Sequence, residues 1–388
     1  MTDFYEIETQ YGAGVYAKRN LCIVRGQGAS LFDANGNEYL DCSSGHGVAN
    51  LGHAHPKVAA AVAEQAATLI TLFESFPNDK RAVLMQKMAS LVPGLVRVFF
   101  CNSGAEAVEA ALKFARISTG RTNIVATMRA FHGRTFGALS ATFNKKYREG
   151  YEPLVPGFRH VPFNKIEALK AAVTDKTAAV ILEIIQGEGG VYTVDTEYIQ
   201  AARWICDENG ALLIADEVQS GFGRTGRMFA VQHFDIIPDL LCCAKSLAGG
   251  VPMGAVLIGE KVQNLTPGTH ATTFGGNPLS CAAGIAAITA IEEEDLPRQA
   301  AEKGAYLLEK LHQIDSPLIR EVRGMGLLVG IELKQKVAPY LKMLQDHNII
   351  ALNAGMAVLR LLPPLVISYE QIDVLVTAID KVLMADQS

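Results

Sequence analysis

The chain of 388 residues lacks any hydrophobic run long enough to form a membrane helix. Although 49% of its residues are hydrophobic, no uninterrupted stretch approaches the roughly 18 to 20 apolar residues needed to cross a bilayer. The first residues, MTDFYE, are acidic and polar, so they provide neither the basic nor the apolar part of a signal peptide. These absences argue against a membrane protein and predict a cytoplasmic one.

A dominant charge of one sign is also absent. The 35 basic and 40 acidic residues are interspersed and give a net charge of -5. Nothing in this pattern resembles the basic face of a protein that binds nucleic acid. We therefore expect no nucleic-acid partner.

Cysteines are few and irregularly spaced. The chain has seven, an odd number, and Cys242 and Cys243 are adjacent within an apolar run. This spacing supports neither a disulfide framework nor a zinc site, so reduced and mostly buried thiols are expected. His53 and His55 precede Pro56, but no Cys, His or acid stands nearby at a supporting ligand spacing, so no metal site is predicted.

Short apolar runs alternate with stretches of helical period along most of the chain. The runs predict strands at residues 96–100, 124–128, 178–185, 211–215, 240–244 and 255–258, and helices are predicted at residues 105–116, 196–207, 278–291 and 300–312. This alternation predicts an α/β fold, a mostly parallel sheet with helices on both faces.

The sequence pattern changes from about residue 294. Charged stretches of helical period surround a short strand predicted at 327–333, and a last helix is predicted at 369–384. A chain of this length usually forms more than one domain, at about 150 residues each. We expect a large domain at residues 49–293 and a smaller α/β domain built from both termini, residues 1–48 and 294–388.

The most informative residues are an acid and a lysine that each follow an apolar run. Asp216 follows the run at 211–215, and Lys245 lies between the run at 240–244 and a stretch of small residues. A carboxylate at a strand end can hold a pyridine nitrogen protonated, and a lysine amine can bond covalently to an aldehyde. This pair is therefore typical of a site for pyridoxal 5'-phosphate.

Two other kinds of site share parts of this pattern. An apolar strand that ends in Asp-Glu also occurs in P-loop ATPases, but these need a Gly-Lys pair and the chain contains none. Residues 221–226, GFGRTG, fit a dinucleotide fingerprint, yet residues 216–220 separate them from the strand and no suitably spaced acid follows. Both interpretations are disfavoured.

A polar turn between the strand at 96–100 and the following helix is a candidate phosphate site. Asn102 or Ser103 can cap the helix, and Gly104 allows a ligand to approach the backbone closely. The N-terminus of a helix offers free N–H groups and the positive end of the helix dipole, both of which favour a phosphate. A plain helix cap remains the alternative for the turn by itself.

Six motifs in order resemble class III aminotransferases of fold type I, in the subgroup of acetylornithine and related ω-aminotransferases. They are residues 102–106 (NSGAE), 131–135 (FHGRT), 186–190 (QGEGG), 216–219 (DEVQ), Lys245, and 273–278 (TFGGNP). The resemblance extends from Tyr16 to Pro363. It implies a fold type I transferase that depends on pyridoxal 5'-phosphate, with Lys245 and Asp216 as the catalytic residues.

The resemblance also implies which residues contact the cofactor. These are Ser103, Gly104 and Ala105 at the phosphate, Phe131 and Val218 on the two faces of the ring, Gln219 at the ring hydroxyl, and Thr273 at the phosphate of the neighbouring subunit. Core packing is the alternative role for Phe131 and Val218. The role of Thr273 implies a homodimer with shared active sites.

Four further residues would face the substrates. By the resemblance, Tyr16 lies at the pocket mouth, Arg134 binds a substrate carboxylate, and Arg360 binds the α-carboxylate of 2-oxoglutarate. Glu188 would neutralise Arg360 while the amine donor is bound. A planar guanidinium can make two parallel bonds to a carboxylate, although either arginine could instead be a solvated surface charge.

The amine donor is ambiguous in the sequence. Residues 23–28, 47–52 and 322–326 are most similar to enzymes that act on a carrier-protein-bound aminoadipate semialdehyde, whereas other stretches fit N-acetylornithine enzymes equally well. His46, Ile184 and residues 18–21 depart from the usual family residues. We predict transamination of the terminal amino group of N-acetylornithine or of carrier-protein-bound lysine or ornithine with 2-oxoglutarate, in arginine or lysine biosynthesis.

Two other functions share parts of this sequence pattern. The first is a 4-aminobutyrate or ornithine aminotransferase. The second is a coenzyme-binding protein without turnover, which is disfavoured because both Lys245 and Asp216 are present.

Overall fold

A seven-stranded sheet forms the centre of the structure, a computed structural model that describes residues 4–385. Its order is β4-β12-β11-β10-β7-β5-β6. β12 runs antiparallel to both of its neighbours, whereas the pairs β11–β10, β10–β7, β7–β5 and β5–β6 are parallel. The strands are β4 (Leu95–Cys101), β5 (Asn123–Thr127), β6 (Phe158–Val161), β7 (Thr177–Glu183), β10 (Leu212–Asp216), β11 (Leu240–Cys243) and β12 (Gly254–Gly259).

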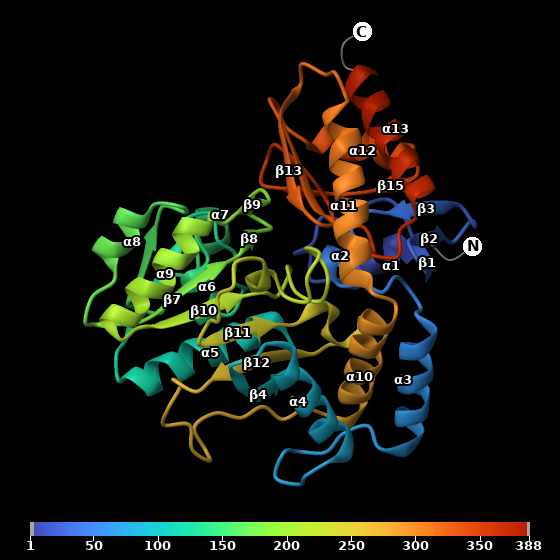
Figure 1. Cartoon of the computed structure of the whole chain (residues 1–388). Helices are drawn as coiled ribbons and strands as arrows, with labels where there is room; N and C mark the ends of the chain where they lie inside the picture. Colours follow the sequence, from blue (N-terminus) through green and yellow to red (C-terminus); the bar gives the residue numbers. More distant parts are fainter. Residues whose placement is uncertain (1–3, 386–388) are drawn as a thin grey trace.

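Helices connect these strands and pack around the sheet, as Figure 1 shows. They are α3 (Pro56–Thr68), α4 (Asp79–Leu91), α5 (Gly104–Thr119), α6 (Phe136–Ala141), α7 (Lys145–Arg148), α8 (Ile166–Ala172), α9 (Thr196–Asn209) and α10 (Pro278–Glu293), with 3-10 turns η1 (Ala230–His233) and η2 (Lys245–Ala248). Within residues 4–385, no helix combines the length and the apolarity needed to span a membrane.

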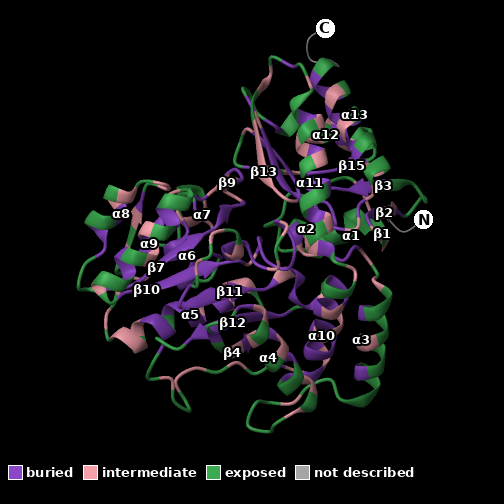
Figure 2. Cartoon of the chain, viewed as in Figure 1, coloured by how far each residue is buried: buried purple, intermediate pink, exposed green. Residues whose placement is uncertain are grey.

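The two faces of the sheet are both buried, because the side chains of each strand alternate between them. On β10, Leu212 and Ile214 join the hydrophobic cluster that contains α5 and α6. Leu213 and Ala215 point the other way and join the larger cluster that contains residues of α4, α8, α9 and α10. Figure 2 shows the strands as buried between helices whose outer faces are exposed. The predicted α/β fold, a mostly parallel sheet with helices on both faces, is confirmed.

Helix α5 illustrates how local sequence sets these elements. Ser103 caps its first turn, and its hydroxyl accepts a hydrogen bond from the N–H of Glu106. Gly120 ends the helix in the left-handed conformation, which glycine adopts without a steric penalty. The face predicted from the helical period, which includes Val108 and Leu112, is buried. The helix is longer than the predicted residues 105–116 because both caps lie outside the periodic stretch.

The remaining strands form two further four-stranded sheets and a hairpin. The orders are β1-β2-β3-β15 and β13-β14-β17-β16, and β8 pairs with β9. The strands are β1 (Ile23–Gln27), β2 (Ser30–Asp33), β3 (Glu38–Asp41), β8 (Ile185–Gln186), β9 (Tyr192–Thr193), β13 (Ile319–Met325), β14 (Leu328–Leu333), β15 (Ile349–Ile350), β16 (Leu352–Ala354) and β17 (Val358–Leu361). Their helices are α1 (Phe4–Tyr11), α2 (Ser44–Gly47), α11 (Leu296–His312), α12 (Ala338–Asp346) and α13 (Tyr369–Ala385).

N-terminal and C-terminal segments share one of these sheets. β15 pairs in parallel with β3, so Ile349 lies beside Leu40. In Figure 1, β1–β3 and α11–α13 lie together above the central sheet. On this sheet membership we propose the division into a large domain, residues 49–293, and a small domain, residues 1–48 and 294–388.

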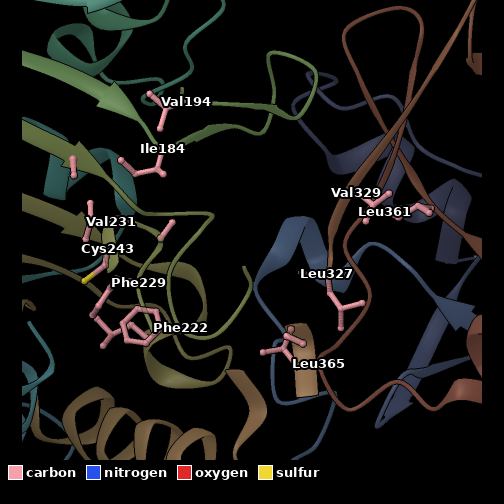
Figure 3. Close-up of a cluster of buried hydrophobic side chains, with 14 of the residues drawn as sticks. Ile184, Val194, Phe222, Phe229, Val231, Cys243, Leu327, Val329, Leu361 and Leu365 are labelled. Atoms are coloured by element: carbon pink, nitrogen blue, oxygen red, sulfur yellow. The ribbon is translucent and has the colours of Figure 1, made fainter. Parts of the chain in front are cut away.

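The larger hydrophobic cluster is continuous across both parts of the molecule. Figure 3 shows Ile184 and Cys243 from the central-sheet side of this cluster, and Val329 and Leu361 from strands β14 and β17. Six of the seven cysteines are buried, and all seven are free thiols.

The expected strand at residues 178–185 is wrong at its C-terminal end. β7 ends at Glu183, and β8 then leaves the central sheet to pair with β9. The physical reason lies in the Glu183 carboxylate, which accepts hydrogen bonds from the N–H groups of Phe131 at 2.9 Å and Gly187 at 3.3 Å. These bonds hold the strand end against two loops, so the chain turns away from the sheet.

Candidate active site

A cavity of about 460 Å³ opens at the carboxyl ends of the parallel strands. This edge of an open α/β sheet is where ligands bind, and the volume suits a small-molecule site. Ten of the residues predicted from the sequence line this one cavity: Ser103, Gly104, Ala105, Phe131, Arg134, Glu188, Asp216, Val218, Gln219 and Lys245.

Asp216 lies at the floor of the cavity, at the end of β10, and is held by two neighbours. Its Oδ2 lies 2.7 Å from Nδ1 of the buried His132, and its Oδ1 accepts a hydrogen bond from the N–H of Val218 at 3.1 Å. Burial opposes the charging of His132, but the bond to Asp216 and the charge of that carboxylate raise the pKa of the imidazole above 6.5. The carboxylate is therefore fixed in one orientation toward the cavity, and each oxygen keeps a further lone pair for a ligand.

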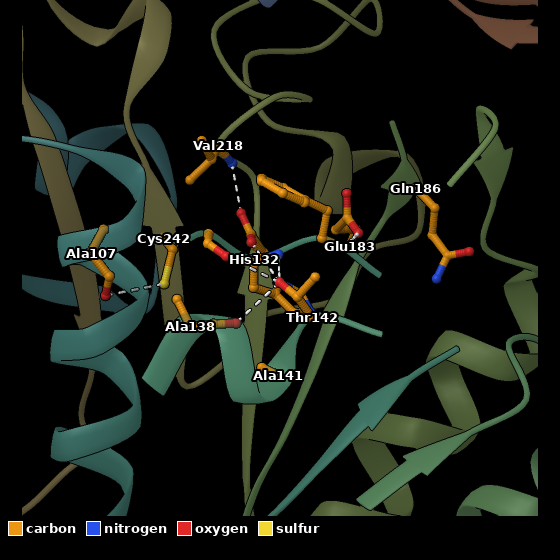
Figure 4. Close-up of polar contacts among 12 residues, drawn as sticks. Ala107, His132, Ala138, Ala141, Thr142, Glu183, Gln186, Val218 and Cys242 are labelled. Carbon is orange, nitrogen blue, oxygen red and sulfur yellow. Dashed lines mark hydrogen bonds and ion pairs between the residues drawn. The ribbon is translucent and has the colours of Figure 1, made fainter. Parts of the chain in front are cut away.

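A second buried acid, Glu183, lies beside Asp216 because the two residues are in register on β7 and β10. Burial, with the nearby charge of Asp216, raises the pKa of Glu183 to about 7. Figure 4 shows His132, Glu183 and Val218 gathered at this strand edge.

His132 and Glu183 were not among the residues predicted for the site. The available signal was that a buried strand-end carboxylate needs hydrogen-bond partners. His132 stands next to Phe131 in a polar motif, and Glu183 ends an apolar strand as Asp216 does.

Lys245 is the first residue of η2, is separated from β11 only by Ala244, and has a positive backbone φ of 44°. A non-glycine residue in this region is strained, and such strain concentrates at functional sites. The pKa of the Lys245 amine is lowered to about 8, chiefly by burial and then by the positive charge of Arg360, whereas the charges of Glu188 and Asp216 act in the opposite direction. The amine is thus partly neutral near physiological pH, which a nucleophile or a base requires.

The N-terminus of α5 faces the same cavity. The N–H groups of Gly104 and Ala105 belong to the first turn, so they have no acceptor within the helix. A Cβ atom at residue 104 would come within 2.7 Å of Val218 Cγ1, so only glycine fits at this point. This combination of free donors, helix dipole and small residue fits a phosphate group.

Two half-buried side chains, Phe131 and Val218, line the cavity between Asp216 and the first turn of α5. The ring of Phe131 also packs edge-on against Tyr147, with centroids 5.5 Å apart. These residues fit the flat ring of pyridoxal 5'-phosphate: an acid for its nitrogen, apolar surfaces for its faces and a helix end for its phosphate.

Arg360, on β17, is fully buried beside the cavity. Its Nη2 lies 2.5 Å from Glu188 Oε1, and its Nη1 donates a hydrogen bond to Gln219 Oε1 at 3.2 Å. Its Nε has no hydrogen-bond partner among residues 4–385. A Cβ atom at Gly187 would overlap with the amide group of Gln219, so a side chain at this position would displace Gln219 from its place beside Arg360. A buried guanidinium with one acid partner and a free donor is suited to exchange that acid for another carboxylate.

Arg134 lies at the exposed rim of the cavity. Its guanidinium carbon is 4.1 Å from the centroid of the Tyr147 ring and 6.0 Å from that of Phe131. Stacking on Tyr147 holds the guanidinium near the cavity while its donors remain available.

Besides Arg360, which lies next to the cavity, two predicted residues do not line it in the single chain. Tyr16 is 83% exposed, and Thr273 is exposed in the loop before α10. The neighbour Thr272 accepts a hydrogen bond from Asn102 Nδ2 at 3.0 Å, which connects this loop to the turn before α5.

The histidines of the His53-x-His55 segment each pair with an acid. His53 Nε2 lies 2.7 Å from Asp41 Oδ2, and His55 Nε2 lies 3.0 Å from Glu294 Oε1. In the part of the chain that the structure describes, no group of three or more His, Cys, Asp or Glu side chains is arranged so that it could hold a metal ion.

Comparison with known protein families identifies the family of this chain. The family described as "Aminotransferase class-III" matches residues 12–383, so the chain belongs to the class III aminotransferases. The resemblance seen in the motifs is confirmed, and with it the prediction of an aminotransferase.

The chain is similar to named enzymes over almost its whole length. It is 51% identical over 381 residues to the [LysW]-aminoadipate semialdehyde transaminase of Deinococcus radiodurans, covering 97% of this chain and 89% of that protein. It is 44% identical over 389 residues to the acetylornithine aminotransferase of Methanocaldococcus jannaschii, covering 98% of both. The ornithine aminotransferase of Toxoplasma gondii, whose structure shows partial occupancy of PLP at the active site, superposes with a TM-score of 0.95 at 35% identity, covering 99% of this chain and 94% of that one.

Proposed function

We propose that this aminotransferase transfers the terminal amino group of N-acetylornithine, or of lysine or ornithine held by a carrier protein, to 2-oxoglutarate. The observation that carries the proposal is the convergence of Lys245, Asp216 and the first turn of α5 on one cavity. The relatives that act on acetylornithine or on [LysW]-aminoadipate semialdehyde support this donor class. The route in which the enzyme works, arginine or lysine biosynthesis, follows from which donor it uses.

The cofactor in this proposal is pyridoxal 5'-phosphate. When bound, it supplies an aldehyde for covalent bonding to an amine and a protonated ring that withdraws electrons from the substrate carbon. Asp216 would hold the ring nitrogen protonated, Ser103, Gly104 and Ala105 would hold the phosphate, and Phe131, Val218 and Gln219 would hold the ring. Thr273 would reach the phosphate of a second subunit, so the proposed catalytic unit is a homodimer.

Lys245 has two tasks in the proposed reaction. Its Nζ would be the group that holds the cofactor covalently at rest. When it is free, Nζ would accept the proton from the substrate carbon that bears the amino group, and the resulting ammonium would give that proton back later in the same half-reaction. A pKa of about 8 suits this work, because the amine accepts and donates protons near neutral pH.

Substrate exchange would depend on the pair of Arg360 and Glu188. While the amine donor is bound, Glu188 would neutralise Arg360, a role that the 2.5 Å ion pair between them supports. When 2-oxoglutarate enters, its α-carboxylate takes the place of Glu188 at the guanidinium. Arg134 binds a carboxylate at the cavity rim, and Tyr16 contributes at the mouth. The free cysteines are consistent with a cytoplasmic location, which we include in the proposal.

A panel of amine donors tests the function. N-acetylornithine, carrier-linked lysine, ornithine and 4-aminobutyrate are compared at equal concentration with 2-oxoglutarate as acceptor. We expect the highest kcat/KM with one of the first two. Higher kcat/KM with free ornithine or 4-aminobutyrate would favour the alternative function and reject this one.

A single variant tests the chemistry. Lys245→Ala removes both the covalent attachment point and the proton carrier, so transamination should be abolished while phosphate anchoring at α5 remains. Normal turnover by this variant would exclude the assignment of Lys245.

A further inference from the structure

The loop that carries Glu188 joins β8 to β9 and adopts an unfavourable backbone conformation. Gly190 has a φ of 123° and Val191 has a φ of 60°. A β-branched residue in the left-handed region is a steric outlier, so the surrounding structure must hold it in place. Val191 is fully buried, and its N–H donates to the carbonyl of Gln186 at 2.8 Å.

Arg323, on β13, binds this loop from the sheet β13-β14-β17-β16, called the C-terminal sheet below. Its Nε and Nη2 both donate to the carbonyl oxygen of Gly190, at 2.9 and 2.7 Å. Its Nη1 lies 2.6 Å from Glu321 Oε2 and 2.8 Å from Glu332 Oε2. The side chain is only 11% exposed, so these bonds are largely shielded from water. A planar guanidinium can make this set of bonds at once, whereas an ammonium group cannot.

Tyr192, the first residue of β9, adds a second contact between the loop and Arg323. The Arg323 guanidinium carbon lies 3.9 Å from the centroid of the Tyr192 ring, and that of Arg129 lies 4.4 Å from it. The Tyr192 hydroxyl donates to Glu332 Oε2 at 3.0 Å, the same oxygen that Arg323 contacts. Arg323 therefore holds the loop through both a backbone carbonyl and a stacked ring.

The register of the C-terminal sheet places the two arginines on one face. Arg323 pairs with Gly330, and Gly330 pairs with Arg360 on the next strand. Residues directly opposite one another across neighbouring strands point to the same face. A Cβ atom at Gly330 would come within 3.0 Å of Val191 Cβ, so the loop packs on the glycine between the arginines. On one side of the point where Val191 packs on Gly330, Arg360 pairs with Glu188, and on the other side Arg323 binds the carbonyl of Gly190.

We propose that Arg323 is a positioning residue that holds the loop of Glu188 on the C-terminal sheet, and thereby sets how strongly Glu188 competes with a substrate carboxylate for Arg360. This inference rests on the proposed function of the Glu188–Arg360 pair and deepens it. Arg323 has no contact with the substrates in this role, and it acts through the loop alone.

Substrate kinetics of the full enzyme give the first test, with Arg323→Gln as the variant. A loosened loop lets Glu188 leave Arg360 more easily, so the KM for 2-oxoglutarate should fall. The KM for the amine donor should rise, because the Arg360 charge is then left unneutralised during the donor half-reaction. We expect the ratio of the two KM values to change by at least about fivefold, since residues in one network commonly couple to this extent.

Arg320→Gln is the matched control. Arg320 lies on the same strand and its Nη1 donates to Glu332 Oε1 at 3.0 Å, but the side chain is 60% exposed and no contact joins it to Gly190. This variant removes the same charge beside the same acid, and we expect wild-type kinetics. Arg323→Lys keeps the charge without the forked geometry, so it should shift the KM ratio in the same direction as Arg323→Gln and serves if the latter does not fold.

A second test needs no turnover. The pKa of Lys245 responds to Arg360, which lowers it, and to Glu188, Asp216 and Glu183, which raise it. In the full chain freed of cofactor, competitive acetylation with acetic anhydride reports the pH at which the Lys245 amine becomes neutral. Both Arg323→Gln and Glu188→Gln should move this midpoint to lower pH, because in each variant the charge of Glu188 no longer offsets that of Arg360.

The two tests separate the inference from the proposed function. Failure of the wild-type protein to use the proposed substrates would reject the proposed function, while the acetylation test would still report on Arg323. Equal rises of both KM values in Arg323→Gln would indicate a merely structural role. An acetylation midpoint that moves in Glu188→Gln and stays at the wild-type pH in Arg323→Gln would also overturn the inference.

Discussion

The Lys245 amine should be neutral in an unusually large fraction of molecules near pH 7. Its pKa is lowered from 10.5 to about 8, chiefly because burial disfavours the charged form. At pH 7 an amine with a pKa of about 8 is neutral in about one molecule in ten, whereas a pKa of 10.5 leaves roughly one in 3,000 neutral. The cavity therefore increases the reactive fraction of Lys245 by about 300-fold.

The positive charge of Arg360 contributes to this lowering, so its removal is the decisive perturbation. In Arg360→Gln, the positive charge that lowers the pKa of Lys245 is removed, while the negative charge of Glu188, which raises it, remains. The pKa of the amine should therefore rise. In the full chain freed of cofactor, the rate at which Lys245 reacts with acetic anhydride, followed by mass spectrometry from pH 6 to pH 11, measures the change. The midpoint should lie near pH 8 in the wild-type chain and higher in the variant.

Lys57 provides an internal reference in the same experiment. Its amine is hydrogen-bonded to Glu293, which raises its pKa, and it lies outside the cavity. Its labelling should therefore rise later on the pH scale than that of Lys245 and should be unaffected by Arg360→Gln. Coincident profiles for the two lysines, or a variant midpoint below that of the wild type, would refute the assigned role of burial and of Arg360.

Three further predictions concern the cofactor, the substrate and stability. Asp216→Asn should reduce kcat by orders of magnitude, and an unchanged rate would show that another acid protonates the ring. Arg134→Ala should raise the KM of carboxylate-bearing donors far more than that of simple amines; equal effects would remove its proposed role. Lys245→Met should stabilise the cofactor-free chain at pH 7 in denaturant titrations. Between pH 8 and 10.5 the Lys245 amine is protonated in the unfolded chain and neutral in the folded one, so the free energy of unfolding of the wild type rises with pH. The difference in free energy of unfolding between Lys245→Met and the wild type should therefore become smaller over this pH range. A gap that stays constant across this window would contradict the pKa assigned to Lys245.

Gly104 offers a test of the phosphate cradle. A Cβ atom at this position would meet Val218 Cγ1 at 2.7 Å, so Gly104→Ala should weaken the binding of pyridoxal 5'-phosphate, measured by fluorescence titration. The double variant with Val218→Ala removes the clash and should recover part of the affinity. Unchanged binding in the single variant would exclude close approach of the cofactor to this turn.

Elements that depend on local sequence were predictable. The α5 helix was anticipated from its apolar face and from Ser103 as a cap, because both act within a few residues. Asp216 and Lys245 were identified because each ends an apolar run, and strand ends in a parallel sheet meet at one edge. The strand at 178–185 was misjudged at its end, because hydrogen bonds from distant loops, and not its own apolar residues, end β7 at Glu183.

Contacts between distant segments were not predictable in the same way. His132 and Asp216 are 84 residues apart, and Arg323 and Gly190 are 133 apart. The sequence around each of these residues does not indicate which distant residue it contacts. Their pairing follows from strand order and register, which depend on how every element packs.

The amino-acid sequence by itself determined the class of fold, the edge of the sheet where chemistry can occur, and the two residues best suited to carry it. These depend on hydrophobic period, caps and the position of polar residues after strands, which are local properties. Only the tertiary structure decided how Asp216 is oriented by His132, how burial lowers the pKa of Lys245, and how Arg360 and Arg323 share one loop. Charge and hydrogen bonding act over a few ångströms in space, so they become defined only when distant segments meet.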